Sequence, residues 1–167
     1  MRLPIRMLVG PSLLAAVFAA AAGTVNVTFI NASSYGDAGN SSWDEEANLK
    51  LLERHLQRLG QRLLPADHVL KLDVLQLDLA GTVRAFHRAD TRVRVVTGGA
   101  DWPRILLRYT HEADGKPLAS GQEWVADLDY SRGVPGRVSN EDLYYEKRML
   151  DMWFKARFVA ALRGAPG

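Results

Sequence analysis

The strongest constraint on the fold is a row of leucines in the first half of the chain. The leucines recur at alternating steps of three and four residues, at Leu49, Leu52, Leu56, Leu59 and Leu63. This spacing places all of them on one side of an α-helix, and that apolar side must be buried against another element. We therefore predict an amphipathic helix over about residues 43–64, with Ser42 and Glu45 forming a capping box at its start.

A second apolar row with helical spacing lies near the end of the chain. Its members are Leu143, Leu150, Trp153, Phe154, Phe158 and Leu162. We predict a second amphipathic helix over about residues 141–162, and we expect Glu146, Arg148 and Asp151 to point mainly outward from it.

Apolar and polar residues alternate before and between these helices, which is typical of β-strands. The predicted strands span about residues 24–30, 69–79, 104–111 and 118–128, with at most a minor strand around 93–95. The alternation changes phase within the second strand, which predicts a β-bulge near Val74-Leu75 or burial of both faces. Asp114-Gly115 indicates a hairpin turn.

The predicted order of elements is β-α-β-(β)-β-β-α. Two strands joined by a helix should lie parallel, and the hairpin should extend the same sheet antiparallel. Each helix has one apolar side, so both should cover one face. We predict an α+β fold, a two-layer sandwich in which a mixed sheet of about four to five strands carries two amphipathic helices on one face. Residues 23–164 should form this single compact domain, followed by a disordered tail at 165–167.

The first 22 residues have the three parts of a secretory signal peptide in order. Arg2 and Arg6 precede an apolar stretch, and small residues end it at 19–22. The uninterrupted apolar run from Leu13 to Ala22 is shorter than the roughly 20 residues that a membrane-spanning helix needs. We predict cleavage near Ala22, a periplasmic or secreted location, and no transmembrane segment.

The charge and the cysteine content exclude several classes of protein. The whole chain has 21 basic and 19 acidic residues, so removal of Arg2 and Arg6 leaves a neutral domain. A neutral domain is poorly suited to nucleic acid, because sequence-independent binding requires clustered cations. The chain has no cysteine, which excludes disulfides, thiolate metal sites, cysteine nucleophiles and a lipid anchor on an N-terminal cysteine.

Several short motifs are distinctive in combination. They are Val27-Thr28-Phe29-Ile30-Asn31, Tyr35-Gly36-Asp37-Ala38-Gly39, Asp78-Leu79-Ala80-Gly81, Ala100-Asp101-Trp102-Pro103-Arg104, Leu107-Arg108-Tyr109, and Tyr145-Glu146-Lys147-Arg148-Met149-Leu150 followed by Trp153-Phe154. Together they resemble a bacterial family of exported proteins known as domain-of-unknown-function family 3016, over nearly all of the chain after the signal. The resemblance implies periplasmic export and one compact domain, and it implies no activity.

No motif in the sequence specifies a reaction. A Gly-x-Ser-x-Gly elbow, a phosphate-binding loop and a dinucleotide fingerprint are all absent. The four histidines have no metal-ligand spacing to one another. We therefore expect no metal and no cofactor, and we assign no catalytic residue. Paired carboxylates at Asp73 and Asp78, and at Asp127 and Asp129, could perform acid–base chemistry if one were buried, but outward-facing strand residues are the simpler interpretation.

Two segments are candidate surfaces for a ligand or a partner. The first contains Asp101, Trp102 and Arg104, which combine a carboxylate, an aromatic ring and a guanidinium on a loop that enters a strand. The alternative is that Trp102 packs in the core and Asp101 pairs with Arg104. The second contains Tyr145 and Arg148, three residues apart on one helix face, for which packing against the sheet is the alternative.

These observations favour a non-catalytic binding or accessory protein of the cell envelope, with an envelope protein as its partner. A hydrolase-type enzyme is one alternative, with a carboxylate site drawn from Asp73, Asp78, Asp101 or Asp127. Binding of a small molecule or lipid in an apolar cavity between the sheet and the helices is the other. The sequence does not indicate an oligomeric state.

Overall fold

A four-stranded sheet forms the centre of the fold in the computed structural model, which describes residues 22–86, 91–132 and 142–164. The strands are β1 (Thr24–Phe29), β2 (His68–Asp78), β5 (Arg104–Ala113) and β6 (Lys116–Ala126). They lie in the order β1-β2-β5-β6, with β1 parallel to β2 and the other neighbouring pairs antiparallel. The predicted mixed sheet is confirmed, with four strands.

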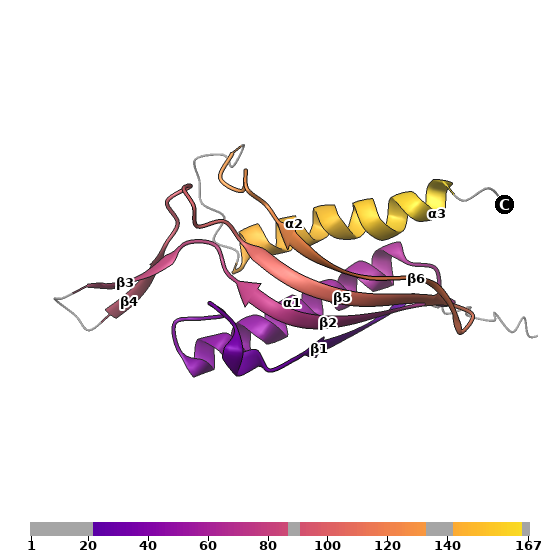
Figure 1. The fold of residues 1–167 in the computed structure, drawn as a ribbon, viewed down its shortest axis with the longest axis horizontal. Helices are drawn as coiled ribbons and strands as arrows, with labels where there is room; N and C mark the ends of the chain where they lie inside the picture. Colours follow the sequence, from indigo (N-terminus) through magenta and orange to yellow (C-terminus); the bar gives the residue numbers. More distant parts are fainter. Residues whose placement is uncertain (1–21, 87–90, 133–141, 165–167) are drawn as a thin grey trace, which may run out of the picture.

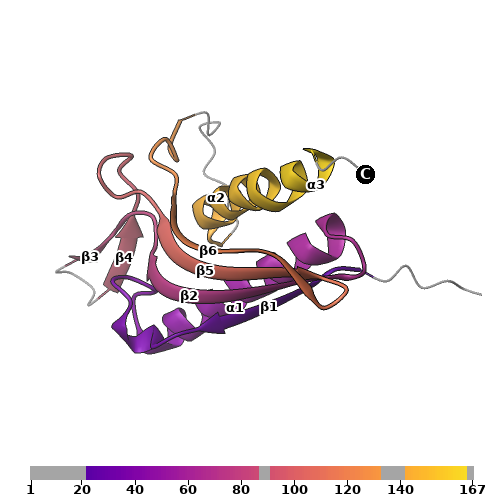
Figure 2. The same cartoon turned by 45° about the vertical axis from the view of Figure 1, so that its right-hand side comes forward.

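Helix α1 (Ser42–Leu63) and a C-terminal helical segment lie along the same face of this sheet (Figure 1, Figure 2). The C-terminal segment consists of α2 (Tyr144–Phe154), the π-helical turn η2 (Lys155–Val159) and α3 (Ala160–Gly164). One hydrophobic cluster fills the space between helices and sheet, and its fully buried members include Leu56, Leu70, Leu107 and Phe154. The predicted α+β arrangement, with both helices on one face, is therefore confirmed.

Helix α1 begins one position earlier than the predicted capping box. Ser41 is the N-cap, and its hydroxyl accepts a hydrogen bond of 3.2 Å from the amide of Asp44. The assignment of Ser42 and Glu45 to the capping box is therefore wrong. Both adjacent serines have an acidic residue three positions later, so the sequence pattern alone fits either serine.

The phase change in β2 and the hairpin signal are both confirmed. The pairing of β2 with β5 shifts register between Val74 and Gln76, so that Val74 before the bulge and Leu77 after it are both buried. Asp114 and Gly115 have φ angles of 48° and 72°. These left-handed conformations are the ones that a two-residue hairpin turn requires.

Residues 82–99 contain more β-structure than the sequence predicts, which is at most a minor strand. They contain β3 (Thr82–Phe86) and β4 (Thr91–Val95), which pair antiparallel and form a separate two-stranded sheet. This ribbon, which we call the arm, extends from one end of the main sheet (Figure 1). Threonine and arginine occupy many of its positions, so the apolar alternation that indicates a strand is weak there.

The two terminal predictions fall largely outside the described residues. The predicted signal peptide up to residue 21 and the predicted tail at 165–167 are among the residues that the structure does not describe. Within the three described ranges, no helix combines the length and the apolar character that crossing a bilayer requires.

The close approach of α1 to β1 predicts an unusual effect at Gly60. Alanine in place of glycine inside a helix normally stabilises it by about 1 kcal/mol. Here a Cβ atom at position 60 would lie 2.3 Å from Cγ2 of Val25. We expect Gly60→Ala to lower the free energy of unfolding by about 1–2 kcal/mol, because the overpacked core must shift. Urea unfolding measures this change.

A second substitution tests whether Val25 causes the effect. In the background of Val25→Ala, the clashing methyl group is absent, so Gly60→Ala should be neutral or stabilising. A stabilising effect of Gly60→Ala in the wild-type background would show that the helix accommodates the methyl group.

Candidate functional site

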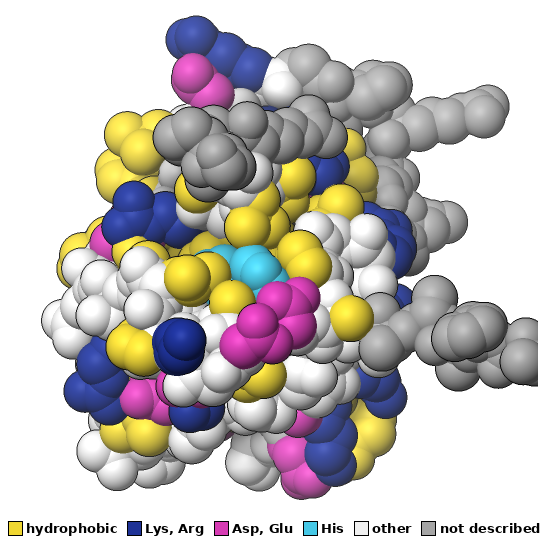
Figure 3. Space-filling model, turned by 90° about the vertical axis from the view of Figure 1, so that its right-hand side faces the viewer, with side chains coloured by type: hydrophobic (Ala, Val, Ile, Leu, Met, Phe, Trp, Pro, Cys, Tyr) yellow, Lys and Arg dark blue, Asp and Glu magenta, His cyan; other side chains and the backbone are white. Residues whose placement is uncertain are grey.

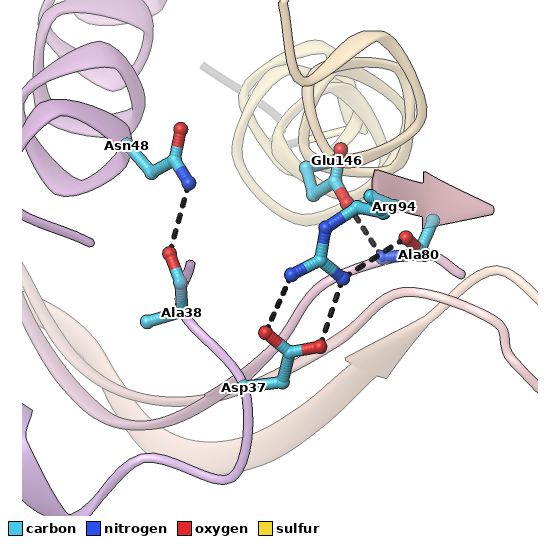
Figure 4. A network of polar contacts seen from close by, with 6 residues as sticks. All are labelled: Asp37, Ala38, Asn48, Ala80, Arg94 and Glu146. Carbon is cyan, nitrogen blue, oxygen red and sulfur yellow. Dashed lines mark hydrogen bonds and ion pairs between the residues drawn. The ribbon is translucent and has the colours of Figure 1, made fainter. Parts of the chain in front are cut away.

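A polar network joins four elements at the end of the sheet where the arm begins (Figure 4). Asp37 comes from the turn after the 3₁₀ helix η1 (Ala32–Ser34), and Arg94 comes from β4. Ala80 follows β2, and Glu146 is on α2. Asp37 is fixed by its backbone, which accepts a hydrogen bond from the amide of Leu79 and donates one to the carbonyl of Leu77.

The guanidinium of Arg94 is the centre of this network. It donates to both oxygens of Asp37, with Nη1 2.8 Å from Oδ2 and Nη2 2.6 Å from Oδ1. This bidentate pairing is the strongest form of an arginine–carboxylate contact. Nη1 also lies 3.3 Å from the carbonyl oxygen of Ala80. The contacts fasten the base of the arm to the turn after η1 and to the end of β2.

Glu146 completes the network from the helix side. Its Oε1 accepts a hydrogen bond of 2.7 Å from the amide of Ala80, and the residue is 3% exposed. Burial raises the pKa of Glu146, although the Ala80 amide and the nearby Arg94 act in the opposite direction. The prediction that Glu146 points outward is therefore wrong. Its spacing of four residues from Leu150 and eight from Phe154 places it on the buried side of α2.

The predicted site residue Asp101 is held by a second set of contacts near the first. Its Oδ1 accepts a hydrogen bond of 2.5 Å from the hydroxyl of Tyr130 and one of 3.0 Å from the amide of Gly99. Its Oδ2 accepts from both the amide and the hydroxyl of Thr97. Although partial burial alone would raise the pKa of Asp101, the hydrogen bonds from Tyr130 and Thr97 lower it to about 2. Asp101 is therefore ionised and fully engaged in the loop between β4 and β5.

Tyr130 connects the two candidate surfaces. Its ring is completely buried and packs edge-to-face against the predicted site residue Tyr145, with ring centroids 5.0 Å apart. Burial and the hydrogen bond to Asp101 raise the pKa of Tyr130 to about 12. The remaining predicted residue of that surface, Arg148, forms an ion pair of 2.9 Å with Asp127, whose carbonyl accepts from the amide of Tyr130. The structure thus brings Asp101, Tyr145 and Arg148 together around Tyr130.

Trp102 follows Asp101 in the same loop, and Arg104 is the first residue of β5. The alternative pairing of Asp101 with Arg104 is wrong, because Arg104 donates to Asp78 at 2.9 and 2.7 Å. Trp102 is only half-buried and is not part of the core cluster. Both residues line a hollow of about 340 Å³, together with Asp37, Asp78 and Asp101.

The carboxylates proposed for acid–base chemistry each have a cationic partner. Asp73 pairs with Arg108 on the exposed face of the sheet, and Asp129, beyond the end of β6, pairs with Arg132. Asp127 is 8% exposed, so its assignment to an outward-facing position is wrong; it pairs with Arg148. Each of these carboxylates is therefore engaged in an ion pair, an arrangement that suits structural contacts and charge recognition.

Two histidines form a buried pair at the opposite end of the sheet. Nδ1 of His68 lies 2.8 Å from Nε2 of His111, and the residues are 6% and 5% exposed. Burial and the neighbouring His68 lower the pKa of His111. The hydrogen bond between them requires at least one neutral ring. Within the described ranges, no three His, Asp or Glu side chains are grouped in a way that could hold a metal ion.

The lowered pKa of His111 predicts that weak acid destabilises the protein. The unfolded chain binds the proton at the ordinary pKa of 6.5, above the value in the folded state, so stability falls as the pH drops through that range. We expect the urea midpoint to decrease from pH 7.5 to pH 5.5, and to decrease less in His111→Gln. The raised pKa of Glu146 acts in the opposite direction but equally in both proteins. Identical decreases in both proteins would contradict a contribution from His111.

The fold and these contacts define an α+β protein in which the described helices cover one sheet face and leave the other open, with a polar network at the arm end. The profile of a family described as a protein of unknown function, DUF3016, matches residues 23–156, so the chain belongs to this family. No curated protein matches the chain. The family membership confirms the resemblance seen in the sequence. Four of the sequence motifs that carry this resemblance meet at the arm end. They contain Asp37, Ala80, Asp101 and Glu146.

Proposed function

We propose that the protein is an exported, non-catalytic binding protein of the cell envelope, and that its partner binds the sheet face that the helices leave uncovered. The observation that carries this proposal is Trp124 on β6. Its side chain is 55% exposed, and the guanidinium of Arg104 lies 5.8 Å from the ring centroid. Tryptophan and arginine are the residues that most often dominate the affinity of protein interfaces.

A ladder of ion pairs between β2 and β5 lies on the same uncovered face. The pairs are Lys71–Glu112, Asp73–Arg108 and Asp78–Arg104, each at 2.7 Å. Exposed pairs of this kind contribute only about 0–1 kcal/mol to stability. They do hold long side chains in fixed positions, which lowers the entropy that binding a partner would cost. This supports recognition of a partner with a mixed polar and apolar surface.

Trp124 should therefore matter for binding and little for stability. We expect Trp124→Ala to change the free energy of unfolding by no more than about 0.5 kcal/mol, because the side chain is largely exposed. The same substitution should weaken capture of the partner strongly. Urea unfolding measures the effect on stability. Pull-down of the partner, once crosslinking has identified it, measures the effect on binding. A large loss of stability would instead assign Trp124 a structural role.

A photo-crosslinker can identify the partner in the cell. Benzoylphenylalanine at position 124 should give a discrete crosslinked protein, whereas the same group at Arg58, an exposed position on α1, should not. Products that are the same at both positions would contradict the proposed surface. Absence of a product at position 124, together with turnover in a broad panel of hydrolase substrates, would favour the carboxylate-enzyme hypothesis.

Export is tested separately from binding. The arginines and the apolar run before residue 23 support it, since a signal peptidase cleaves after such a segment. Intact mass of the protein from the periplasmic fraction of its host should correspond to a chain that starts near Gly23. A periplasmic protein that retains Met1 to Ala22, or a protein confined to the cytoplasm, would overturn the proposal of cleavage and export.

A further inference from the structure

A crevice between β6 and the C-terminal helical segment lies at the end of the molecule opposite the arm. Its volume is about 440 Å³. Apolar walls come from Leu118 and Ala119 on β6 and from Phe158 and Leu162 on the helical side, and His111 borders it on β5. Figure 3 looks onto this end, where histidine atoms are visible between hydrophobic side chains. The volume is at the lower end of the roughly 300–1,000 Å³ that is usual for small-molecule sites.

Both elements that border the crevice depart from regular geometry at this place. The C-terminal segment changes to the π-helical turn η2 at Lys155–Val159, which contributes Arg157 and Phe158 to the crevice. On β6, the register shifts so that Leu118 has no partner between Pro117 and Ala119. π-helical turns occur frequently at functional sites, and β-bulges redirect a side chain next to them. Two independent irregularities therefore lie on opposite sides of one apolar crevice.

Arg157 gives the crevice one charged group. Its Nε and Nη2 donate to the hydroxyl of Tyr109, and its Nε lies 3.4 Å from Oε1 of Glu123. That Glu123 oxygen also accepts a hydrogen bond from the indole of Trp153. Among the described residues, Nη1 of Arg157 has no hydrogen-bond partner, and the side chain is 49% exposed. Tyr109 and Glu123 thus orient a guanidinium that still has free donors.

We propose that this crevice binds a single-chain amphiphile with an anionic head group. The apolar chain lies between the β6 wall and Phe158, and the anionic oxygens accept hydrogen bonds from Nη1 of Arg157. The volume fits one chain of medium length and not two. A fatty-acid carboxylate and the phosphate of a lysophospholipid present the same chemistry to the guanidinium.

Displacement of a fluorescent dansyl-undecanoate probe tests the proposal. The protein used is the full chain in the form that its host produces after processing. Dodecanoate and a lauroyl lysophosphatidylglycerol are the anionic competitors, and dodecanol and dodecylammonium are the neutral and cationic controls. We expect saturable binding of the anionic competitors. Ala161→Phe should fill the crevice and weaken dodecanoate binding at least about tenfold. The matched control is Ala156→Phe, at an exposed position of η2 that does not line the crevice.

Arg157→Gln tests the head group. It should weaken the binding of dodecanoate about tenfold and leave the binding of dodecanol unchanged. Arg157→Lys should restore part of the lost affinity for dodecanoate. Tighter binding of the lysolipid would identify a phosphate as the natural head group, and tighter binding of dodecanoate a carboxylate. The proposal is overturned if folded protein binds neither anionic amphiphile, if Ala161→Phe binds as tightly as Ala156→Phe, or if dodecylammonium binds as tightly as dodecanoate.

Discussion

Replacement of Arg94 by alanine should lower the free energy of unfolding by about 3 kcal/mol, because it leaves an unpaired carboxylate in a partly buried site. The side chains of Arg94 and Asp37 are 20% and 21% exposed, so water can only partly replace the lost guanidinium. The carbonyl of Ala80 also loses a donor. Urea unfolding at pH 7 measures the change, and the arm should become the first segment to exchange its amide hydrogens.

A double-mutant cycle separates the interaction energy of the Arg94–Asp37 pair from the effects of each substitution on its surroundings. Asp37→Ala should also destabilise the protein, but the double variant should be more stable than the sum of the two losses predicts, by at least about 1 kcal/mol. Arg104→Ala is the matched control, since it breaks an arginine–aspartate pair of similar length on the exposed face and should cost no more than about 1 kcal/mol. If Arg94→Ala costs no more than this control, the network does not fasten the arm.

The main elements could be predicted from the sequence because their signals are local. The leucine row of α1 and the phase change in β2 each lie within one segment, and periodicity reports which side of a segment is buried. The hairpin turn follows from the left-handed conformations that Asp114 and Gly115 adopt readily. The sequence underestimates the arm because a two-stranded ribbon needs no continuous apolar face, and the apolar alternation there is limited to a short run at Val93 and Val95.

The polar network could not be predicted because its partners are distant in the sequence. Asp37 and Arg94 are 57 positions apart, and Ala80 and Glu146 are 66 apart. Only the burial of Glu146 had a local signal, its helical spacing from Leu150 and Phe154. A charged residue on an apolar helical side indicates a buried polar contact, and this spacing outweighs the usual preference of glutamate for solvent.

Residues of the two predicted surfaces meet at Tyr130 for a reason that the sequence does not contain. Asp101 and Tyr145 are both in contact with Tyr130, which follows β6 in a segment that reads as a loop. An aromatic residue in a loop has no periodicity that shows its burial. The role of the predicted residues in binding remains a prediction, but their mutual support around one buried ring is a structural finding.

Tyr130 should therefore be among the most sensitive positions outside the sheet and the helices. We expect Tyr130→Ala to lower the free energy of unfolding by about 3–5 kcal/mol, because it leaves a large cavity in a site where the ring is completely buried. Tyr130→Phe keeps the ring and should cost about 1–3 kcal/mol, because the Gly98 amide loses its acceptor and Asp101 loses a donor. Urea unfolding of both variants at pH 7 measures the difference.

The phenylalanine variant also has a specific signature at Asp101. The hydrogen bond from Tyr130 is the largest of the contributions that lower the pKa of Asp101 to about 2, so Tyr130→Phe should move this pKa upward toward its ordinary value of 3.8. A carboxyl-carbon NMR titration detects the shift. Tyr144→Phe, which keeps a ring edge-to-face with Tyr145, should change stability by no more than about 0.5 kcal/mol and leave Asp101 unchanged. If the pKa of Asp101 is the same in Tyr130→Phe as in Tyr144→Phe, then Thr97 and Gly99 hold that carboxylate without the tyrosine, and Tyr130 acts through packing alone.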